Sequence, residues 1–313
     1  MRLSILCVRD DFLIFDIGLF HGSSVLVNPF SGRLVCLRKL EVILESLENN
    51  CLKIERIFMN HIDLKFQKDS EGKKILSPEL PESGLNEPRL DVEIMDENSG
   101  RIYPVFQQKA GSYGEYSEYM TRHGCACCSL TTALAAFVDR YRELTPDRTI
   151  SEVERKHFPE KVYAENYGKV MARQMPVSLY GISVILKKEG VPCEYIGDFE
   201  DVTAQKQIME HLWKGKPVII ETSRMRRKGR RIVRFFDKKY AGSYHTMILL
   251  GVDEEGQVVF TDSATRDWAG DVQRLKRAEL AELICYMFQQ KNTEDTHVYF
   301  SRKKNTGGYI LIN

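Results

Sequence analysis

The sequence predicts an α+β fold made of two domains, and three observations lead to this prediction. Its 313 residues exceed the usual length of a single domain. The segment 67–101 is rich in charge, proline and glycine and has little periodicity, which is typical of a connection between domains. After that segment, helical patterns come first and strand patterns follow, an order that favours helices packed on an antiparallel sheet. We therefore expect a small α+β domain at 1–95 and a larger domain at 96–313.

The expected N-terminal domain places strands before helices. Apolar runs bounded by turn residues predict strands at 12–20, 23–28 and 33–37. Apolar residues at helical spacing follow at 40–47 and 52–58. This pattern indicates a small unit in which helices pack on a few strands.

The expected C-terminal domain begins with a short strand at 102–106 and continues with a polar stretch up to Gly124. A helix is predicted at 129–142, because its apolar side chains recur at three- and four-residue spacing and share one face. Later elements are expected as helices at 177–189 and 202–213, then strands at 217–222, 245–250 and 258–262.

Composition narrows the class of partner. The 45 Lys and Arg residues nearly balance the 44 Asp and Glu residues, so no overall field favours nucleic acid or an anionic membrane surface. No apolar run approaches the ~20 residues of a membrane span, and the apolar run before the acidic residues Asp10 and Asp11 is too short for a signal peptide. We expect a cytoplasmic protein without a membrane span and without a nucleic-acid partner. The oligomeric state cannot be read from the sequence.

Three of the eight cysteines, Cys125, Cys127 and Cys128, lie within four residues, which is more than core packing requires. A cysteine is a useful nucleophile only as its thiolate, and the positive end of a helix dipole lowers the pKa of a thiol. Cys125 directly precedes the helix predicted from Ser129. It is therefore the candidate nucleophile.

A thiol nucleophile needs a base within reach and a group that orients the base. His245 begins an apolar strand, which predicts that its ring lies at the end of the sheet. Asp262 ends the next strand, and antiparallel pairing would bring the two residues side by side. These residues indicate a Cys-His-Asp arrangement.

A zinc site is the main alternative for the cysteine cluster. His123, Cys125, Cys127 and Cys128 are residue types that bind zinc. Structural zinc sites generally draw two ligand pairs from separate segments, and no second pair follows in the sequence. We therefore expect neither a metal nor another cofactor.

The run from Gly124 to Leu134, Gly-Cys-Ala-Cys-Cys-Ser-Leu-Thr-Thr-Ala-Leu, resembles the nucleophile segment of the peptidases that remove double-glycine leaders from bacteriocins, and of their free-standing relatives. In that family a Gly-Cys-Gly-Pro-Thr-Ser-Leu type of sequence opens the central helix. Similar pieces follow in the family's order over roughly residues 102–265, at 215–219, 245–253, 256 and 261–263.

The resemblance implies a papain-like cysteine peptidase fold, with a central helix packed on an antiparallel sheet. It also implies that Cys125 is the nucleophile, His245 the base and Asp262 the orienting acid. The Gly-Pro that usually follows the nucleophile is Ala126-Cys127 here, so the choice of Cys125 over Cys127 or Cys128 depends on register. The usual Asp-Pro pair is Asp262-Ser263.

The family supplies a glutamine upstream of the cysteine as oxyanion donor, often six residues before it, but Tyr119 occupies that position here. Gln108 matches the strand-then-glutamine pattern of the free-standing members, with Gln107 as the second choice. The amide of Gln108 and the backbone N–H of Cys125 would hold the developing oxyanion, an interaction worth ~3 kcal/mol.

The expected function is that of a cysteine peptidase acting on a peptide or protein substrate through a Cys-His-Asp triad. Residues 25–35 and the helical patterns after them resemble small winged-helix modules that bind leader peptides, which would make the substrate a ribosomal precursor peptide and the reaction leader removal or peptide maturation. The alternatives are a papain-like acyltransferase that uses the same thiol and a non-catalytic peptide-binding relative.

One dense basic run spans 224–234 and predicts a hairpin that turns at Gly229. A charged run of this kind is most simply a solvated loop. Because it leads into the strand of His245, a further hypothesis is that it holds acidic residues of a peptide substrate.

Overall fold

The computed structural model describes residues 3–9, 12–17, 24–27, 61–77, 89–96, 100–108, 113–157, 163–166, 169–172, 178–223, 225–228, 231–234, 245–264, 275–287 and 307–313. The chain divides into two compact units, 1–58 and 59–313, and each is described by itself.

The first unit contains an antiparallel sheet with the strand order β1-β2-β3. Its strands are β1 (Leu3–Arg9), β2 (Phe12–Ile17) and β3 (Ser24–Val27). The second and third agree with the strands expected at 12–20 and 23–28. The strand expected at 33–37 and the helices expected at 40–47 and 52–58 lie outside the described residues.

The second unit begins with a four-stranded sheet of order β5-β4-β6-β7, in which β4 and β6 are parallel and the other neighbours antiparallel. Its strands are β4 (His61–Lys68), β5 (Lys74–Leu76), β6 (Arg89–Met95) and β7 (Gly100–Phe106). The strand expected at 102–106 is confirmed as part of β7. The expectation of an irregular connection at 67–101 is wrong, because the segment contains paired strands.

The charge content of that segment conceals a strand signal. Leu90, Val92 and Ile94 are buried at every second position of β6, which is the period of a strand. All seven residues of β6 pair with β7, so the boundary expected between residues 95 and 96 falls between two neighbouring strands of one sheet. The compact units divide between Phe58 and Met59.

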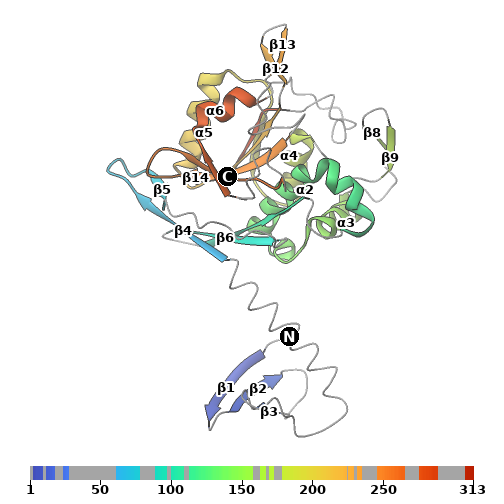
Figure 1. The fold of residues 1–313 in the computed structure, drawn as a ribbon, viewed down its shortest axis with the longest axis vertical. Helices are drawn as coiled ribbons and strands as arrows, with labels where there is room; N and C mark the ends of the chain where they lie inside the picture. Colours follow the sequence, from blue (N-terminus) through green and yellow to red (C-terminus); the bar gives the residue numbers. More distant parts are fainter. Residues whose placement is uncertain are drawn as a thin grey trace. The chain divides into compact units, whose positions relative to one another are not determined.

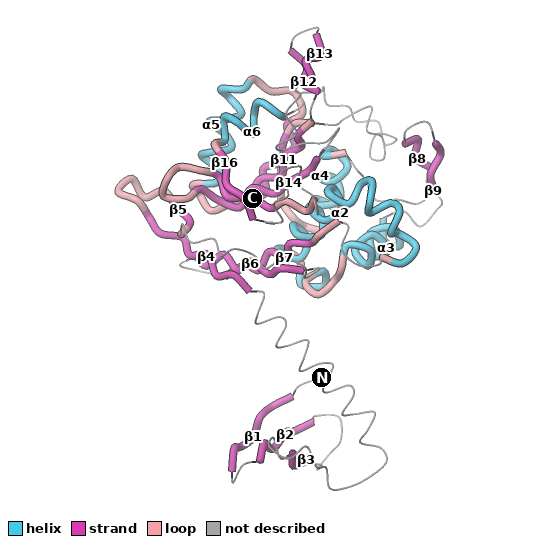
Figure 2. Tube along the Cα trace, viewed as in Figure 1, coloured by secondary structure: helices cyan, strands magenta, loops and turns pink. Residues whose placement is uncertain are grey.

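A six-stranded antiparallel sheet forms the centre of the second unit, in the order β10-β17-β11-β14-β15-β16. The helices and this sheet together make a mixed α+β fold (Figures 1 and 2). The strands expected at 217–222, 245–250 and 258–262 are confirmed. The six strands are β10 (Cys193–Ile196), β11 (Val218–Thr222), β14 (His245–Val252), β15 (Val258–Thr261), β16 (Leu275–Ala278) and β17 (Tyr309–Ile312).

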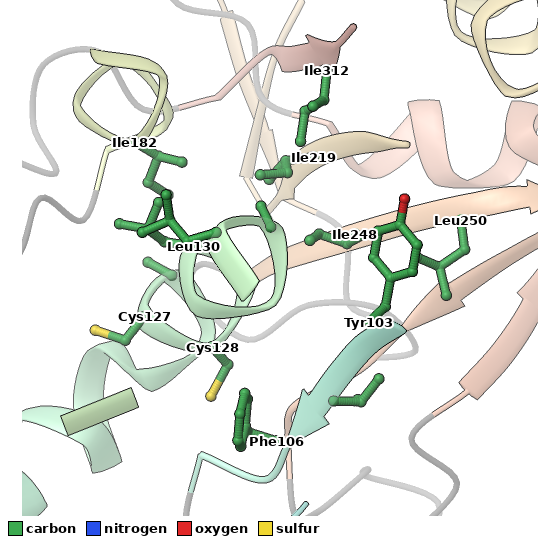
Figure 3. Packing of buried hydrophobic residues seen from close by; sticks show 14 of the residues in the cluster. Tyr103, Phe106, Cys127, Cys128, Leu130, Ile182, Ile219, Ile248, Leu250 and Ile312 are labelled. Atoms are coloured by element: carbon green, nitrogen blue, oxygen red, sulfur yellow. The ribbon is translucent and has the colours of Figure 1, made fainter. Parts of the chain in front are cut away.

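Helices cover the two faces of this sheet. Because side chains alternate along a strand, Ile219 and Ile248 pack with the cluster of α2 (Ser117–Phe137). Ile220 and Met247 pack with the cluster of α5 (Asp201–Leu212) and α6 (Leu280–Tyr286). Figure 3 shows Leu130 of α2 beside Ile219 and Ile248. The helices expected at 177–189 and 202–213 are confirmed as α4 and α5. The other helices are α3 (Pro146–His157), α4 (Leu179–Lys188), α5 (Asp201–Leu212), α6 (Leu280–Tyr286), and the 3-10 turns η1 (Gly114–Tyr116) and η2 (Asp139–Tyr141).

Two short hairpins complete the described part of the unit. They are formed by β8 (Tyr163–Asn166) with β9 (Lys169–Ala172), and by β12 (Met225–Lys228) with β13 (Arg231–Arg234). In the second, Lys228 pairs with Arg231, so the two paired strands expected in the basic run are confirmed, whereas the turn expected at Gly229 lies outside the described residues. Among the helices described, none combines the length and apolar character that a bilayer crossing requires.

The start of α2 differs from expectation. The helix predicted from Ser129 begins at Ser117, twelve residues earlier, so Cys125 lies inside the helix and does not precede it. The early turns are polar and carry no repeated apolar stripe, which is why periodicity does not detect them. The expectation that a helix terminus lowers the pKa of Cys125 is therefore wrong, and its backbone N–H lies within the helical hydrogen-bonding pattern.

Candidate active site

The nucleophile and base candidates come from α2 and β14. Cys125 is buried in the third turn of α2, and His245 is the buried first residue of β14. Strand β14 is buried along its whole length between β11 and β15, which anchors the histidine at one end of the sheet. The side chains of Cys125 and His245 form a hydrogen bond. The structure therefore brings the two predicted residues together.

Asp262 completes the arrangement directly after the last residue of β15. Its Oδ1 lies 2.8 Å from Nε2 of His245 and accepts a hydrogen bond of 2.9 Å from the backbone N–H of Ala264. Its Oδ2 lies 2.9 Å from Nζ of Lys276. Because Nε2 of His245 is engaged by the carboxylate, Nδ1 is the ring nitrogen left for the thiol.

The surroundings of His245 favour its protonated form. Burial acts against the charged ring, but the charge and hydrogen bond of Asp262 and the hydrogen bond and charge of Cys125 outweigh burial and raise the pKa of His245 to about 10. A positively charged imidazole beside a thiol is a physical cause of thiolate formation. The imidazolium of His245 therefore favours the thiolate of Cys125, the role that the sequence analysis assigned to a helix terminus.

Asp262 is held as a carboxylate. Burial favours the neutral acid, but the charge and hydrogen bond of His245, followed by the charge of Lys276 and the N–H of Ala264, keep the pKa of Asp262 well below its usual range. The acid therefore presents a full negative charge to the imidazole ring.

The two neighbouring cysteines belong to the core. Burial, followed by the charges on Cys128 and Cys125, raises the pKa of the Cys127 thiol well above its usual value. Cys128 is buried and lies beside Phe106 (Figure 3). Of the three cysteines, Cys125 is the one whose thiol contributes a hydrogen bond to His245.

The two glutamine candidates differ in their surroundings. The backbone N–H of Gln108 donates to the carbonyl of Ser263 over 2.8 Å, and its Oε1 lies 3.4 Å from the Ser263 hydroxyl. A Cβ built on Gly124 would lie 2.5 Å from Cβ of Gln108, so Gln108 packs directly on the residue before Cys125. Gln107 is buried, and its carbonyl accepts a 2.6 Å hydrogen bond from the Tyr113 hydroxyl. The geometry thus brings Gln108 to the site.

The sequence reasoning missed a buried carboxyl group near the thiol. Glu221 of β11 is 1 % exposed, and one of its oxygens has no hydrogen-bond partner among the described residues. Burial, opposed in part by the backbone N–H of Gly307 and aided by the charge of Cys125, raises the pKa of Glu221 well above its usual value. A glutamate inside the apolar run Val-Ile-Ile-Glu-Thr was the available signal.

Lys276 and Gly124 were also missed. Lys276 reaches Asp262 from β16, a strand that the sequence reasoning did not predict. Gly124 matters because its missing side chain leaves room for Gln108. Within the described ranges, no three His, Cys, Asp or Glu residues cluster in a way that could hold a metal ion.

Comparison with known proteins gives one result for the chain. A family model with the description Peptidase_C39 like family matches residues 102–292, more than half of the chain. The matched stretch includes Gln108, Cys125, His245 and Asp262. No curated protein and no solved structure matches.

Proposed function

Since the chain belongs to the peptidase C39-like family, whose members are papain-like cysteine peptidases related to the bacteriocin leader peptidases, we propose that it hydrolyses a peptide bond with Cys125, His245 and Asp262 as its triad. The family supports a peptidase, and therefore a peptide or protein substrate. The observation that carries the triad is the continuous chain of hydrogen bonds from the thiol through the imidazole to the carboxylate. The packing of α2 against an antiparallel sheet supports a papain-like arrangement.

The proposed reaction begins with the thiolate of Cys125 and the imidazolium of His245. The sulfur attacks the carbonyl carbon of the peptide bond, and the tetrahedral intermediate collapses as Nδ1 of His245 gives its proton to the departing amine. The acyl group then remains on Cys125 as a thioester. His245 takes a proton from a water molecule, which attacks the thioester and releases the carboxylic acid, so that the thiolate of Cys125 and the imidazolium of His245 form again.

Gln108 is the proposed donor to the oxyanion. With its Oε1 facing the Ser263 hydroxyl, its amide nitrogen is the atom available to donate to the negative oxygen. The second expected donor, the backbone N–H of Cys125, lies inside α2. We therefore assign the larger part of oxyanion stabilisation to Gln108.

The substrate proposal is a peptide cut during maturation, with a ribosomal precursor peptide and its leader as the specific form. The hairpin of β12 and β13 lies in the sequence between β11 and β14, and four of its eight strand residues are arginine, at 226, 227, 231 and 234. We propose that it holds acidic residues of the substrate. Charge reversal at Arg227 and Arg230 is expected to slow cleavage of an acidic peptide at low salt, and an unchanged rate would reject the idea.

An acyltransferase is the second candidate, because the same thioester can be resolved by an amine in place of water. Product analysis with and without an added amine separates the two reactions. Hydrolysis alone in the presence of excess amine supports the peptidase, whereas amide products support acyl transfer.

The direct test of the triad is mass spectrometry of candidate peptides incubated with the wild type and with Cys125→Ala. A cut that requires Cys125 is expected. A thiol-directed covalent probe then tests whether the site is catalytic at all, with Cys193 as the internal control, because burial, offset slightly by Lys187, raises the pKa of Cys193 to about 11. Equal labelling of the two cysteines would favour a non-catalytic peptide-binding relative.

A further inference from the structure

Asp262 interacts with two cationic groups through different oxygens. Its Oδ1 faces Nε2 of His245 at 2.8 Å, and its Oδ2 faces Nζ of Lys276 at 2.9 Å. The side chains of Lys276 and Asp262 are only 13 % and 7 % exposed, so water screens this ion pair little. The proposed mechanism assigns no role to Lys276.

The position of Lys276 is fixed by the sheet. Lys276 lies directly opposite Phe260 in the pairing of β15 with β16, and Asp262 is two residues beyond Phe260. The lysine therefore reaches the carboxylate from β16, which neighbours β15 on the side opposite β14. Three contacts, from His245, Ala264 and Lys276, hold the two carboxylate oxygens in one orientation.

Lys276 also changes how much of the negative charge acts on the imidazole. One carboxylate charge is shared between two buried cationic groups, so Lys276 reduces the stabilisation that His245 receives from Asp262. The titratable groups that face this chain of contacts in the described residues are Cys125 from α2 and Glu221 from β11, and the charge of Cys125 contributes to the raised pKa of Glu221.

We propose that Lys276 is a positioning residue of the active site, which acts on Cys125 through Asp262 and His245. It orients the carboxylate and sets the strength of the thiolate and imidazolium pair. This inference rests on the proposed triad. Without Lys276 the site loses a positive charge, so Asp262 would stabilise the imidazolium more strongly and the thiolate would form at higher pH.

Strand β16 provides a matched control. Nε of Arg277, the next residue, lies 3.2 Å from Oδ2 of Asp253, which is buried like Asp262. Asp253 accepts backbone hydrogen bonds from Glu255 and Gln257 in the turn between β14 and β15, at the opposite end of these strands from His245 and Asp262. Arg277→Met therefore removes a partly buried cation of the same strand without touching the triad.

The experiment measures the rate of Cys125 alkylation by iodoacetamide against pH, with site-resolved mass spectrometry of the full chain. The variants are Lys276→Met, Lys276→Gln, Lys276→Arg and Arg277→Met. Both uncharged variants are expected to shift the rise of alkylation to higher pH by roughly half a unit, about a threefold rate loss on the rising limb. Lys276→Arg and Arg277→Met are expected to match the wild type.

An unchanged or downward-shifted profile in Lys276→Met and Lys276→Gln would overturn the inference, as would an equal shift in Arg277→Met. If one uncharged variant fails to fold, the other decides. Alkylation needs no substrate, so its outcome separates the two proposals. Wild-type Cys125 that reacts no faster than Cys193 overturns the triad and this inference together, whereas a reactive Cys125 insensitive to Lys276 overturns this inference alone.

Discussion

Two histidines in this chain each contact a carboxylate, yet their pKa values move in opposite directions. His157 in α3 contacts Glu189 at the end of α4, and burial followed by nearby lysine and arginine charges lowers its pKa to about 4. His245 contacts Asp262, and although burial opposes its charged form, the charges around it raise its pKa to about 10. The residue pair is therefore chemically alike in the two regions, and the surroundings differ.

The difference lies in the other charges around each pair. Glu189 also forms ion pairs with Arg140 and Lys156, so cations repel a proton on His157 and neutralise the carboxylate. The ring of His245 meets the Cys125 thiol in addition to Asp262, and both favour the imidazolium. A buried histidine and carboxylate pair thus does not by itself indicate a catalytic base; the balance of the surrounding charge decides its protonation.

The largest expected effect comes from removing the imidazole ring of His245. His245→Asn removes the proposed proton carrier and is expected to lower peptide cleavage by ~10²–10⁴-fold. His157→Asn is the matched control and is expected to leave the cleavage rate within a few-fold of the wild type. Cleavage is followed by mass spectrometry, with iodoacetamide labelling of Cys125 as a readout that needs no substrate. Equal losses in the two variants would break the comparison.

A second variant tests the packing that distinguishes the His245 region. Gly124→Ala would bring a Cβ to 2.5 Å from Cβ of Gln108, so the glutamine must move away from its place beside Cys125. We expect cleavage to fall about a hundredfold if Gln108 donates to the oxyanion, with alkylation of Cys125 much less affected. Gln108→Ala should show the same loss and Gln107→Ala should not. A wild-type cleavage rate in Gln108→Ala would reject the assignment.

The three triad candidates could be predicted from the sequence because a short local pattern marks each of them. Cys125 stands out in a cysteine cluster, and His245 and Asp262 stand at the ends of strongly apolar strands, which were predicted within a few residues. The strands at 61–95 were missed because charged residues stand between the buried apolar ones and obscure the two-residue period.

Other features could not be predicted because they depend on contacts between distant segments. Lys276 reaches Asp262 only through the pairing of β15 with β16, and a single sequence does not give the register of such a pair. The early turns of α2 are polar, so their helical state depends on the structure around them and not on an apolar stripe. The contact between Gln108 and Gly124 likewise joins two segments that a long polar stretch separates.

Removing the charge of one carboxylate gives a smaller effect. Asp262→Asn keeps a side-chain oxygen for Nε2 of His245 but removes the negative charge, so the pKa of His245 should fall from about 10 toward its usual range. As the pH rises, His245 then loses its proton, and the site its reactive ion pair, at a lower pH than in the wild type. The alkaline limb of the Cys125 alkylation profile therefore moves to lower pH. Glu189→Gln is the control and should leave this limb in place, whereas a shift of similar size in Glu189→Gln would contradict the local origin of the effect.

The smallest effects concern stability against pH. The pKa of His157 is lowered in the folded state, so its contribution to stability is present above pH ~6.5 and lost as pH falls toward 4. The pKa of His245 is raised, so its contribution is present below pH ~6.5 and lost as pH rises toward 10. We expect His157→Asn to flatten the acid side of the melting temperature profile and His245→Asn the alkaline side, each by a few degrees.

These two slopes can be separated because they lie on opposite sides of pH ~6.5, the usual pKa of histidine. Thermal melting of the wild type and both variants at fixed ionic strength between pH 4 and 10 measures them. The double variant should lose both slopes additively, since the residues lie in different elements, α3 and β14, and share no contact among those described. If His157→Asn instead changed the alkaline side, the two regions would be electrostatically coupled, and the opposite pKa values of the histidines could not be assigned to their immediate neighbours.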